Sequence, residues 1–146
     1  MKGIVGDAWK LKEHFNYLAI TTNGFVKTNE HAVMGRGIAK QAKDKYPGID
    51  HLLGKKIQAL GNHVHLLTAD LVSFPVKHNW WEEADIELIK RSCNELMAFL
   101  GTNERILLPR PGCGNGKLKW EEVKKVIEPL LDDRVYIIHL DERYLK

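Results

Sequence analysis

The stretch LLPRPGCGNGKLKW (residues 107–120) places three glycines at alternate positions, Gly112, Gly114 and Gly116. Glycine costs conformational entropy on folding, so a cluster of it indicates that the main chain must approach a partner that side chains would obstruct. A glycine loop that leads into a helix offers unpaired N–H donors and the positive end of the helix dipole, which together suit a phosphate group. The spacing leaves two interpretations open: a phosphate-binding loop, or a tight turn that allows close helix packing.

A second glycine loop, MGRGIA (residues 34–39), has the same relation to a predicted helix. Its glycines, Gly35 and Gly37, precede a run of apolar residues at helical spacing. Two such loops side by side would suit a diphosphate with a sugar at either end. Arg36 and Lys117 could add positive charge beside the phosphates, or each could be a solvated residue at the start of a helix.

Three better-known glycine motifs do not fit the 107–120 stretch. It is not a Walker A loop, because Leu118 follows Lys117 and no hydroxyl side chain is available for magnesium. It is not a dinucleotide-binding fingerprint, because the glycines are spaced GxGxG and lie late in the chain. It is not a nucleophile elbow, because that motif needs a serine and Cys113 stands one position too early. No base can be paired with Cys113 from the sequence, so we do not expect it to be a nucleophile.

Metal and disulfide chemistry are not expected. The chain has two cysteines, Cys93 and Cys113, and no CxxC or Cys/His cluster with zinc spacing, so both are expected to be reduced thiols. His63 and His65 alternate along a predicted strand and share a face, but a metal would need a third ligand. We therefore expect neither a metal nor a cofactor.

Length and composition describe an ordinary globular protein. The 146 residues suggest one domain that buries roughly two thirds of its unfolded surface. The net charge of +3 is too small to argue for a nucleic-acid surface by itself, though it does not oppose an anionic ligand. The N-terminus lacks a signal-peptide pattern, and no apolar run approaches the ~20 residues that span a bilayer. A cytoplasmic protein without a membrane partner is expected.

Predicted strands and helices alternate along the chain. This alternation predicts an α/β fold, a three-layer sandwich with helices on both sides of a mixed, mostly parallel sheet. Ligands in such sheets lie at the carboxyl ends of strands, where both glycine loops begin. Strands are predicted to end at Val5 and to cover 17–22, parts of 63–76, 105–108 and 135–140, and helices to cover 35–46, 49–60, 81–100 and 120–131.

Three blocks of the sequence together resemble the macrodomain family, an ADP-ribose-binding α/β/α module. The GDA block (residues 6–8) is similar to the family's first motif. Asn23 with residues 34–39 is similar to its first ligand loop, and residues 109–123 to its second loop and the following helix. The blocks span nearly the whole chain in the family's order, so the resemblance implies a single macrodomain over residues 1–146.

The resemblance implies roles for individual residues. Asp7 would accept a hydrogen bond from the adenine amino group, although an aspartate here could equally cap a helix. Asn23 would bind the distal ribose, or else form half of an Asn-Gly turn. The complete expected ligand-binding set is Asp7, Ala8, Asn23, Met34, Gly35, Arg36, Gly37, Ile38, Pro109, Gly112, Cys113, Gly114, Asn115, Gly116 and Lys117.

Lys77 is the expected catalytic residue. The chain is most similar to a macrodomain branch that includes deacylating enzymes, an antitoxin that removes ADP-ribose from DNA, and small phage-encoded macrodomains. SFPVKH (residues 73–78) is similar to the antitoxin's stretch, and Lys77 falls on a lysine near the anomeric carbon of the ribose. A partly desolvated lysine can act as nucleophile or base, or stabilise a leaving oxyanion if it stays charged. The alternative is a solvated loop lysine.

The chain departs from the branch at two places. Asn115 and Gly116 stand where some of its enzymes carry an aspartate, so an aspartate-driven step is not expected. The loop between Asn23 and Met34 is also longer than is usual in the family.

Aromatic residues near these motifs have two interpretations. Trp80 and Trp81 are predicted at the start of the 81–100 helix, where at least one should pack beneath it and the other could contact a base or the modified substrate. Tyr136 is predicted on the last strand, near where the family often stacks adenine.

The resemblance implies an ADP-ribose-recognising hydrolase that removes ADP-ribose from a protein ester or a nucleobase. Its partners would be ADP-ribose or an ADP-ribosylated macromolecule, including nucleic acid, and the chain is expected to be a monomer. Three alternatives stay open: an ADP-ribose 1''-phosphate phosphatase, a non-catalytic ADP-ribose-binding module, and a nucleotide-binding structural domain.

Overall fold

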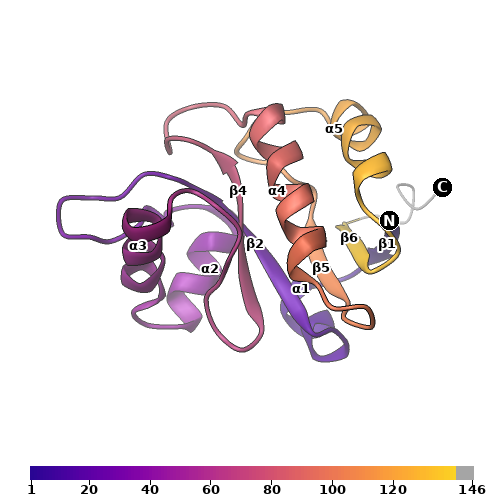
Figure 1. Ribbon diagram of the computed structural model, residues 1–146, viewed down its shortest axis with the longest axis horizontal. Helices are drawn as coiled ribbons and strands as arrows, with labels where there is room; N and C mark the ends of the chain where they lie inside the picture. The colour runs from indigo at the N-terminus through magenta and orange to yellow at the C-terminus, as the bar shows by residue number, and fades with distance from the viewer. Residues whose placement is uncertain (141–146) are drawn as a thin grey trace.

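A mixed sheet organises residues 1–140, which are the residues that the computed structural model describes. Its strands lie in the order β1-β6-β5-β2-β4-β3 (Figure 1). Every neighbouring pair is parallel except β3 with β4, which is antiparallel. The bounds are β1 (Lys2–Val5), β2 (Tyr17–Asn23), β3 (His65–Leu66), β4 (Leu71–Lys77), β5 (Ile106–Pro109) and β6 (Val135–His139).

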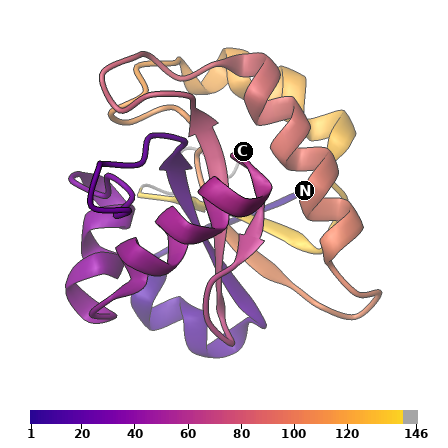
Figure 2. The same ribbon diagram turned by 60° about the vertical axis from the view of Figure 1, so that its left-hand side comes forward.

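Helices cover both faces of the sheet, which confirms the predicted α/β/α sandwich. In Figure 1, α2 and α3 lie on one side of the strands, and α4 and α5 lie on the other; Figure 2 shows the same layers from a second direction. The bounds are α1 (Ala8–Leu11), α2 (Gly37–Lys45), α3 (Ile49–Leu60), α4 (Ile86–Phe99) and α5 (Trp120–Ile127), with 3₁₀ turns at Lys12–His14 and Glu128–Leu130.

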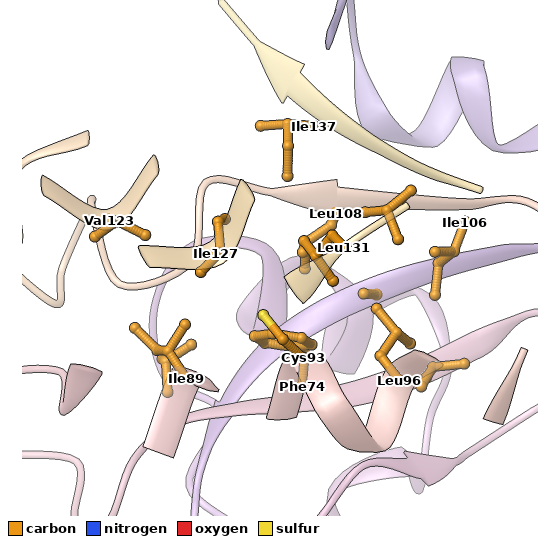
Figure 3. Close-up of a cluster of buried hydrophobic side chains, with 14 of the residues drawn as sticks. Phe74, Ile89, Cys93, Leu96, Ile106, Leu108, Val123, Ile127, Leu131 and Ile137 are labelled. Atoms are coloured by element: carbon orange, nitrogen blue, oxygen red, sulfur yellow. The ribbon is translucent and has the colours of Figure 1, made fainter. Parts of the chain in front are cut away.

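Alternation along the strands sends side chains into two cores. Phe74 of β4 packs with Ile89, Cys93 and Leu96 of α4 and with Ile127 of α5 (Figure 3). The neighbouring positions on the strands face the opposite way, where they meet α2 and α3. That second core contains Leu18, Ile20, Met34, Ala42, Leu53 and Leu71.

The long loop after β2 is held against α3. A Cβ atom on Gly54 would lie 1.9 Å from the main-chain oxygen of Glu30, so only glycine allows the loop to approach the helix this closely. The N–H group of Ala32 donates to the carbonyl oxygen of Asp50 at 2.9 Å. His31 Nδ1 and a carboxylate oxygen of Asp50 are 2.9 Å apart. These contacts give residues 24–34 a defined path beside the strand ends.

Two predicted helix boundaries are wrong, whereas the strands predicted in parts of 63–76 are present as β3 and β4. The helix predicted from Trp81 begins at Ile86, because Asp85 caps it with a carboxylate that accepts the Glu87 N–H. The helix predicted over 120–131 ends at Ile127 and continues as a 3₁₀ turn. Within 63–76 the chain turns between β3 and β4, where Thr68 Oγ1 accepts two main-chain N–H groups. No helix within residues 1–140 is both long and apolar enough to cross a bilayer.

Candidate functional site

A cavity of about 670 Å³ opens where β2, β4 and β5 end. The parallel strands bring Asn23, Lys77 and Pro109 to one edge of the sheet, and the loops that follow them form the walls. Both glycine loops predicted to act together do line this one cavity. The predicted residues that line it are Asn23, Met34, Gly35, Arg36, Gly37, Ile38, Lys77, Pro109, Gly112, Gly114, Asn115 and Gly116.

The loop glycines divide into two groups. Gly35, Gly37 and Gly114 are exposed, and a Cβ atom on any of them would meet no atom within 4 Å. Packing within the protein therefore does not require glycine at these positions, although the φ of +59° at Gly37 favours glycine there. Their bare main chain faces the cavity, as expected of a surface that a ligand approaches closely.

Gly112 and Gly116 are glycine for a structural reason. A Cβ atom on Gly112 would lie 2.9 Å from the Cβ of Ala84, and its φ of +77° favours glycine. A Cβ atom on Gly116 would lie 2.5 Å from the carbonyl oxygen of Gly112. The tight-turn interpretation of this loop is therefore confirmed for Gly112 and Gly116, and phosphate binding by the loop stays a prediction.

The second glycine loop presents main-chain donors. Its turn is closed by the N–H of Lys117, which donates to Gly114 at 3.1 Å, and by the N–H of Leu118, which donates to Gly112 at 2.9 Å. Within residues 1–140, no acceptor is bonded to the N–H groups of Gly114, Asn115 and Gly116. Amide groups in this arrangement can bind an anion.

The first glycine loop leads into α2, and the N-terminus of this helix borders the same cavity. Arg36 is the N-cap residue, and its side chain makes no capping hydrogen bond. The first helical residues, Gly37 and Ile38, line the cavity. The positive end of the α2 dipole therefore faces the space between the two loops.

The charged residues that line the cavity are all cations. They are Lys27, Arg36, Lys77 and Arg110, and no Asp or Glu within residues 1–140 lines it. Together with the amide donors, these charges suit an anionic ligand. Among the described residues, the wall therefore offers no carboxylate that could act as a general base.

Lys77 is buried, so the alternative of a solvated loop lysine is wrong. Its side chain is only 7% exposed. Its Nζ atom lies 3.3 Å from the carbonyl oxygen of Asn115 and 3.5 Å from that of Trp80. Burial lowers the pKa of the ammonium group below its ordinary 10.5, and the positive charges of Lys117 and Arg36 lower it further. No carboxylate among residues 1–140 forms an ion pair with it.

Asn23 holds the start of the long loop. Its side-chain amide donates to the carbonyl oxygen of Val33, and its side-chain oxygen accepts the N–H of Phe25, both at 3.0 Å. The interpretation of Asn23 as half of an Asn-Gly turn is wrong, because Asn23 is the last residue of β2 and neither it nor Gly24 has a positive φ. Because Asn23 also lines the cavity, it fixes the wall beside the site predicted for the ribose.

Asp7 and Ala8 lie outside the cavity lining. Asp7 caps α1: its Oδ1 atom accepts the N–H groups of Trp9 and Lys10 at 2.9 and 3.2 Å. Its second carboxylate oxygen accepts no hydrogen bond within residues 1–140. Ala8 packs against the second core. The structure confirms that Asp7 caps the helix, and its second carboxylate oxygen remains available to a ligand.

Cys113 and Lys117 of the second loop also do not line the cavity. Cys113 packs against the core of α4 and α5, and burial raises the pKa of its thiol to about 11. A thiol of that pKa is protonated at neutral pH, which agrees with the expectation that it is not a nucleophile. Lys117 is exposed, with a φ of +67° that completes the turn.

The sequence interpretation missed several lining residues. Arg110 lies within the 107–120 stretch, and its position between two prolines at a strand end was a usable signal. It donates from Nε to Nδ1 of His139 at 3.0 Å and stacks over Trp120 at 5.2 Å. The further lining residues outside the predicted set are Thr21, Thr22, Phe25, Lys27, Val33, Ala39, Val76 and Trp80.

Tyr136 does not lie at this site. It pairs with Lys2 and Leu107 in the sheet, and its ring packs against Phe15 with centroids 5.0 Å apart. Its hydroxyl is 3.4 Å from the guanidinium of Arg105, which precedes β5. Tyr136 is thus near the amino ends of the strands, so its predicted position beside adenine is wrong.

Fold and cavity together define an α/β/α protein with a cation-lined cavity at the carboxyl ends of parallel strands. Solved structures share this architecture. The macrodomain of Mycobacterium tuberculosis DarG matches with a TM-score of 0.72 at 24% sequence identity, over 93% of this chain and 97% of that one. The macrodomain of Thermus aquaticus DarG matches with a TM-score of 0.70 at 24% identity, over 94% and 95%.

A third match is Thermosipho africanus DarTG, whose structure is a complex with ADP-ribose. The TM-score is 0.76 at 18% identity, over 100% of this chain and 45% of that one. No protein-family model matches the sequence, and no curated protein does. The chain has the macrodomain fold, which confirms at the level of fold the resemblance seen in its sequence.

Proposed function

We propose that this protein binds ADP-ribose in the cavity between its two glycine loops and removes it from a modified macromolecule. The diphosphate would lie between the N-terminus of α2 and the amide groups of Gly114, Asn115 and Gly116. Adenine would extend toward Asp7, and the distal ribose would lie beside Asn23. The paired donors, the cationic lining and a macrodomain fold shared with an ADP-ribose complex support this proposal.

One observation favours hydrolysis over simple binding: the Lys77 amine is buried in the cavity wall without a carboxylate partner. Burial without a counter-ion costs stability, so the position is explained best by a chemical role. A neutral amine can accept a proton from water or add to the anomeric carbon, and a charged one can stabilise the departing group. The bond broken would join the anomeric carbon to the macromolecule.

The substrates follow from this geometry. ADP-ribose attached through its distal ribose would place the linkage beside Lys77 and the rest of the macromolecule outside the cavity. An ester on a protein side chain and a linkage to a nucleobase both satisfy this arrangement. The similarity of fold to DarG macrodomains supports the same branch for this chain.

A non-catalytic ADP-ribose-binding module is the second candidate. The observation in its favour is that no carboxylate within residues 1–140 lines the cavity. It predicts tight binding of ADP-ribose with no turnover of any linkage.

Release of ADP-ribose from a modified peptide ester and from a modified oligonucleotide tests the proposal. The wild type should release it from at least one, and Lys77→Ala from neither. Phosphate release from ADP-ribose 1''-phosphate, with no release from either macromolecule, would instead identify a phosphatase. Binding without any release would identify the non-catalytic module.

A further inference from the structure

The end of β4 departs from regular strand pairing at Lys77. Thr22 of β2 pairs with Pro75, whereas the next residue of β2, Asn23, pairs with Lys77, so β4 has one extra residue here. An extra residue bends a strand and changes the direction of its side chains. The strand pairing alone therefore does not determine where the Lys77 side chain points, and other contacts must hold its main chain.

The carbonyl oxygen of Lys77 accepts two hydrogen bonds from outside β4. The N–H of Gly24 donates to it at 3.1 Å and also to the carbonyl oxygen of His78 at 3.1 Å. The side-chain amide of Asn62 donates to it at 3.1 Å. Asn62 lies between α3 and β3 and does not line the cavity. Its amide therefore contacts the main chain of Lys77 and not the space for a ligand.

The residue after β2 leaves room for the Asn62 amide. A Cβ atom on Gly24 would lie 2.6 Å from Nδ2 of Asn62. The φ of Gly24 is not positive, so its backbone conformation does not require glycine. Glycine at this position is explained by the close approach of the Asn62 side chain to the main chain.

Helix α4 holds Asn62 in place. The guanidinium group of Arg91 donates to the carbonyl oxygen of Asn62. One turn further along α4, the carboxylate of Glu95 accepts the N–H of Val64 at 3.0 Å and lies 2.6 Å from Nδ1 of His63. Residues 62–64 are thus fixed to a helix that itself packs against β4.

We infer that Asn62 is a positioning residue for Lys77, which fixes the main chain of the lysine and thereby the direction of its amine toward the second glycine loop. The inference rests on the proposed function, and it assigns to Asn62 an effect on the chemical step and none on ligand binding. The amine is placed 3.3 Å from the carbonyl oxygen of Asn115. A displacement of about 1 Å in a reacting group can lower a rate by ~100-fold.

Release of ADP-ribose by Asn62→Ala tests this, with the modified peptide ester or oligonucleotide that the wild type turns over. The value of kcat should fall about tenfold, because the amine is less often in its reactive position. KM, and the calorimetric affinity for free ADP-ribose, should change less than about threefold. Asn103→Ala, the same substitution at an exposed asparagine, should change none of these values. Thermal unfolding checks that both variants are folded at the assay temperature.

The pH profile separates positioning from a general structural defect. Burial is the main cause of the lowered pKa of Lys77, and the charges of Lys117 and Arg36 add to it. A looser main chain gives the amine more contact with water, so its pKa should rise toward 10.5 in Asn62→Ala. The pH range over which kcat/KM changes should therefore move to higher pH. A partly unfolded variant would lose active enzyme without such a shift.

Gly24→Ala reaches the same contact from the other side, because its methyl group displaces the Asn62 amide. It should lower kcat about as much as Asn62→Ala and shift the pH profile in the same direction. The double variant should be no more than about twofold slower than the slower single variant, because both changes break one contact. Two unrelated defects would instead multiply.

Several results would overturn the inference alone. An unchanged kcat in Asn62→Ala, a lower kcat with an unmoved pH profile, or multiplied effects in the double variant would show that Asn62 does not act through Lys77. Weaker binding of free ADP-ribose would show that Asn62 shapes the cavity instead. Failure of the wild type to release ADP-ribose from either substrate would overturn the proposed function, and this inference with it.

Discussion

The Nζ atom of Lys77 lies 3.3 Å from the main-chain oxygen of Asn115, which joins the end of β4 to the second glycine loop. The contact fixes a buried amine beside main-chain donors that are available to a diphosphate. A carbonyl oxygen is a weaker partner for an ammonium group than a carboxylate, so the amine stays easier to deprotonate than an ion-paired lysine.

Lys77→Ala should lower the rate of ADP-ribose release at least ~100-fold, the usual scale for losing a positioned acid–base group. Affinity for free ADP-ribose should change less than about threefold, because the diphosphate donors remain. Single-turnover kinetics and calorimetry measure the two effects. Lys55→Ala, an exposed lysine on α3, is the matched control. Equal rates for Lys77→Ala and the wild type would show that the amine takes no part in the chemistry.

The pH dependence of release should report the lowered pKa of Lys77. If the neutral amine reacts, kcat/KM rises with pH and levels off below the ordinary lysine value of 10.5. Lys117→Met removes a positive charge that lowers this pKa, so the rising part of the profile should move to higher pH. A profile that falls across the same range would show that the charged amine is the active form.

Burial of Lys77 should also destabilise the fold at neutral pH. Its folded-state pKa is lower than the unfolded value, so the unfolded chain binds more protons between the two values and stability rises with pH in that window. Lys77→Met should therefore raise the free energy of unfolding at pH 7 by about 1 kcal/mol. The gain should disappear as the pH approaches 10.5. Urea unfolding at several pH values measures it, and a pH-independent difference would contradict the account.

The two groups of glycines should respond differently to alanine. Gly112→Ala places a Cβ atom 2.9 Å from Ala84 at a positive φ and should destabilise the fold by about 2–4 kcal/mol. Gly114→Ala meets no atom and should change stability by less than about 0.5 kcal/mol. It should nevertheless weaken ADP-ribose binding about tenfold or more, because the new methyl group stands where the ligand must approach. Normal affinity in Gly114→Ala would place the diphosphate elsewhere.

Asp7→Ser separates the two roles of that residue. Serine is also a good N-cap, so the free energy of unfolding should stay within about 0.5 kcal/mol of the wild type. Affinity for ADP-ribose should fall about tenfold, because serine cannot present the carboxylate oxygen that Asp7 leaves unused. Denaturant unfolding and calorimetry on one preparation give both numbers. Unchanged affinity would leave Asp7 with the helix cap alone.

The sequence predicted the fold well because its signals are local. β-rich runs such as residues 17–22 and 135–140 and the glycine loops that follow strands fix the alternation of elements. The start of α4 was predicted too early because Trp81 and Glu82 are compatible with a helix. The signal that decides the start is a single N-cap residue, Asp85. The same error led to the wrong expectation that at least one of Trp80 and Trp81 packs beneath the helix, whereas both are exposed.

The candidate site was predictable in outline only. Glycine spacing located both loops, but it could not separate packing glycines from cavity glycines, because that distinction depends on Ala84, far from the loop in sequence. Burial of Lys77 depends likewise on the position of Asn115 across the cavity. The cavity position of Arg110 and the exposure of Trp80 and Trp81 were not predicted for the same reason. Contacts between distant segments leave no local pattern in a sequence.

Calorimetric titration of the wild type with ADP-ribose, ADP and AMP tests the central claim most directly, namely that one cavity between two glycine loops holds a diphosphate and its distal ribose. We expect ADP-ribose to bind with micromolar affinity, about −8 kcal/mol, and at least tenfold more tightly than ADP, with AMP weaker still. Equal affinities for ADP-ribose and ADP, or no binding of either, would contradict the account.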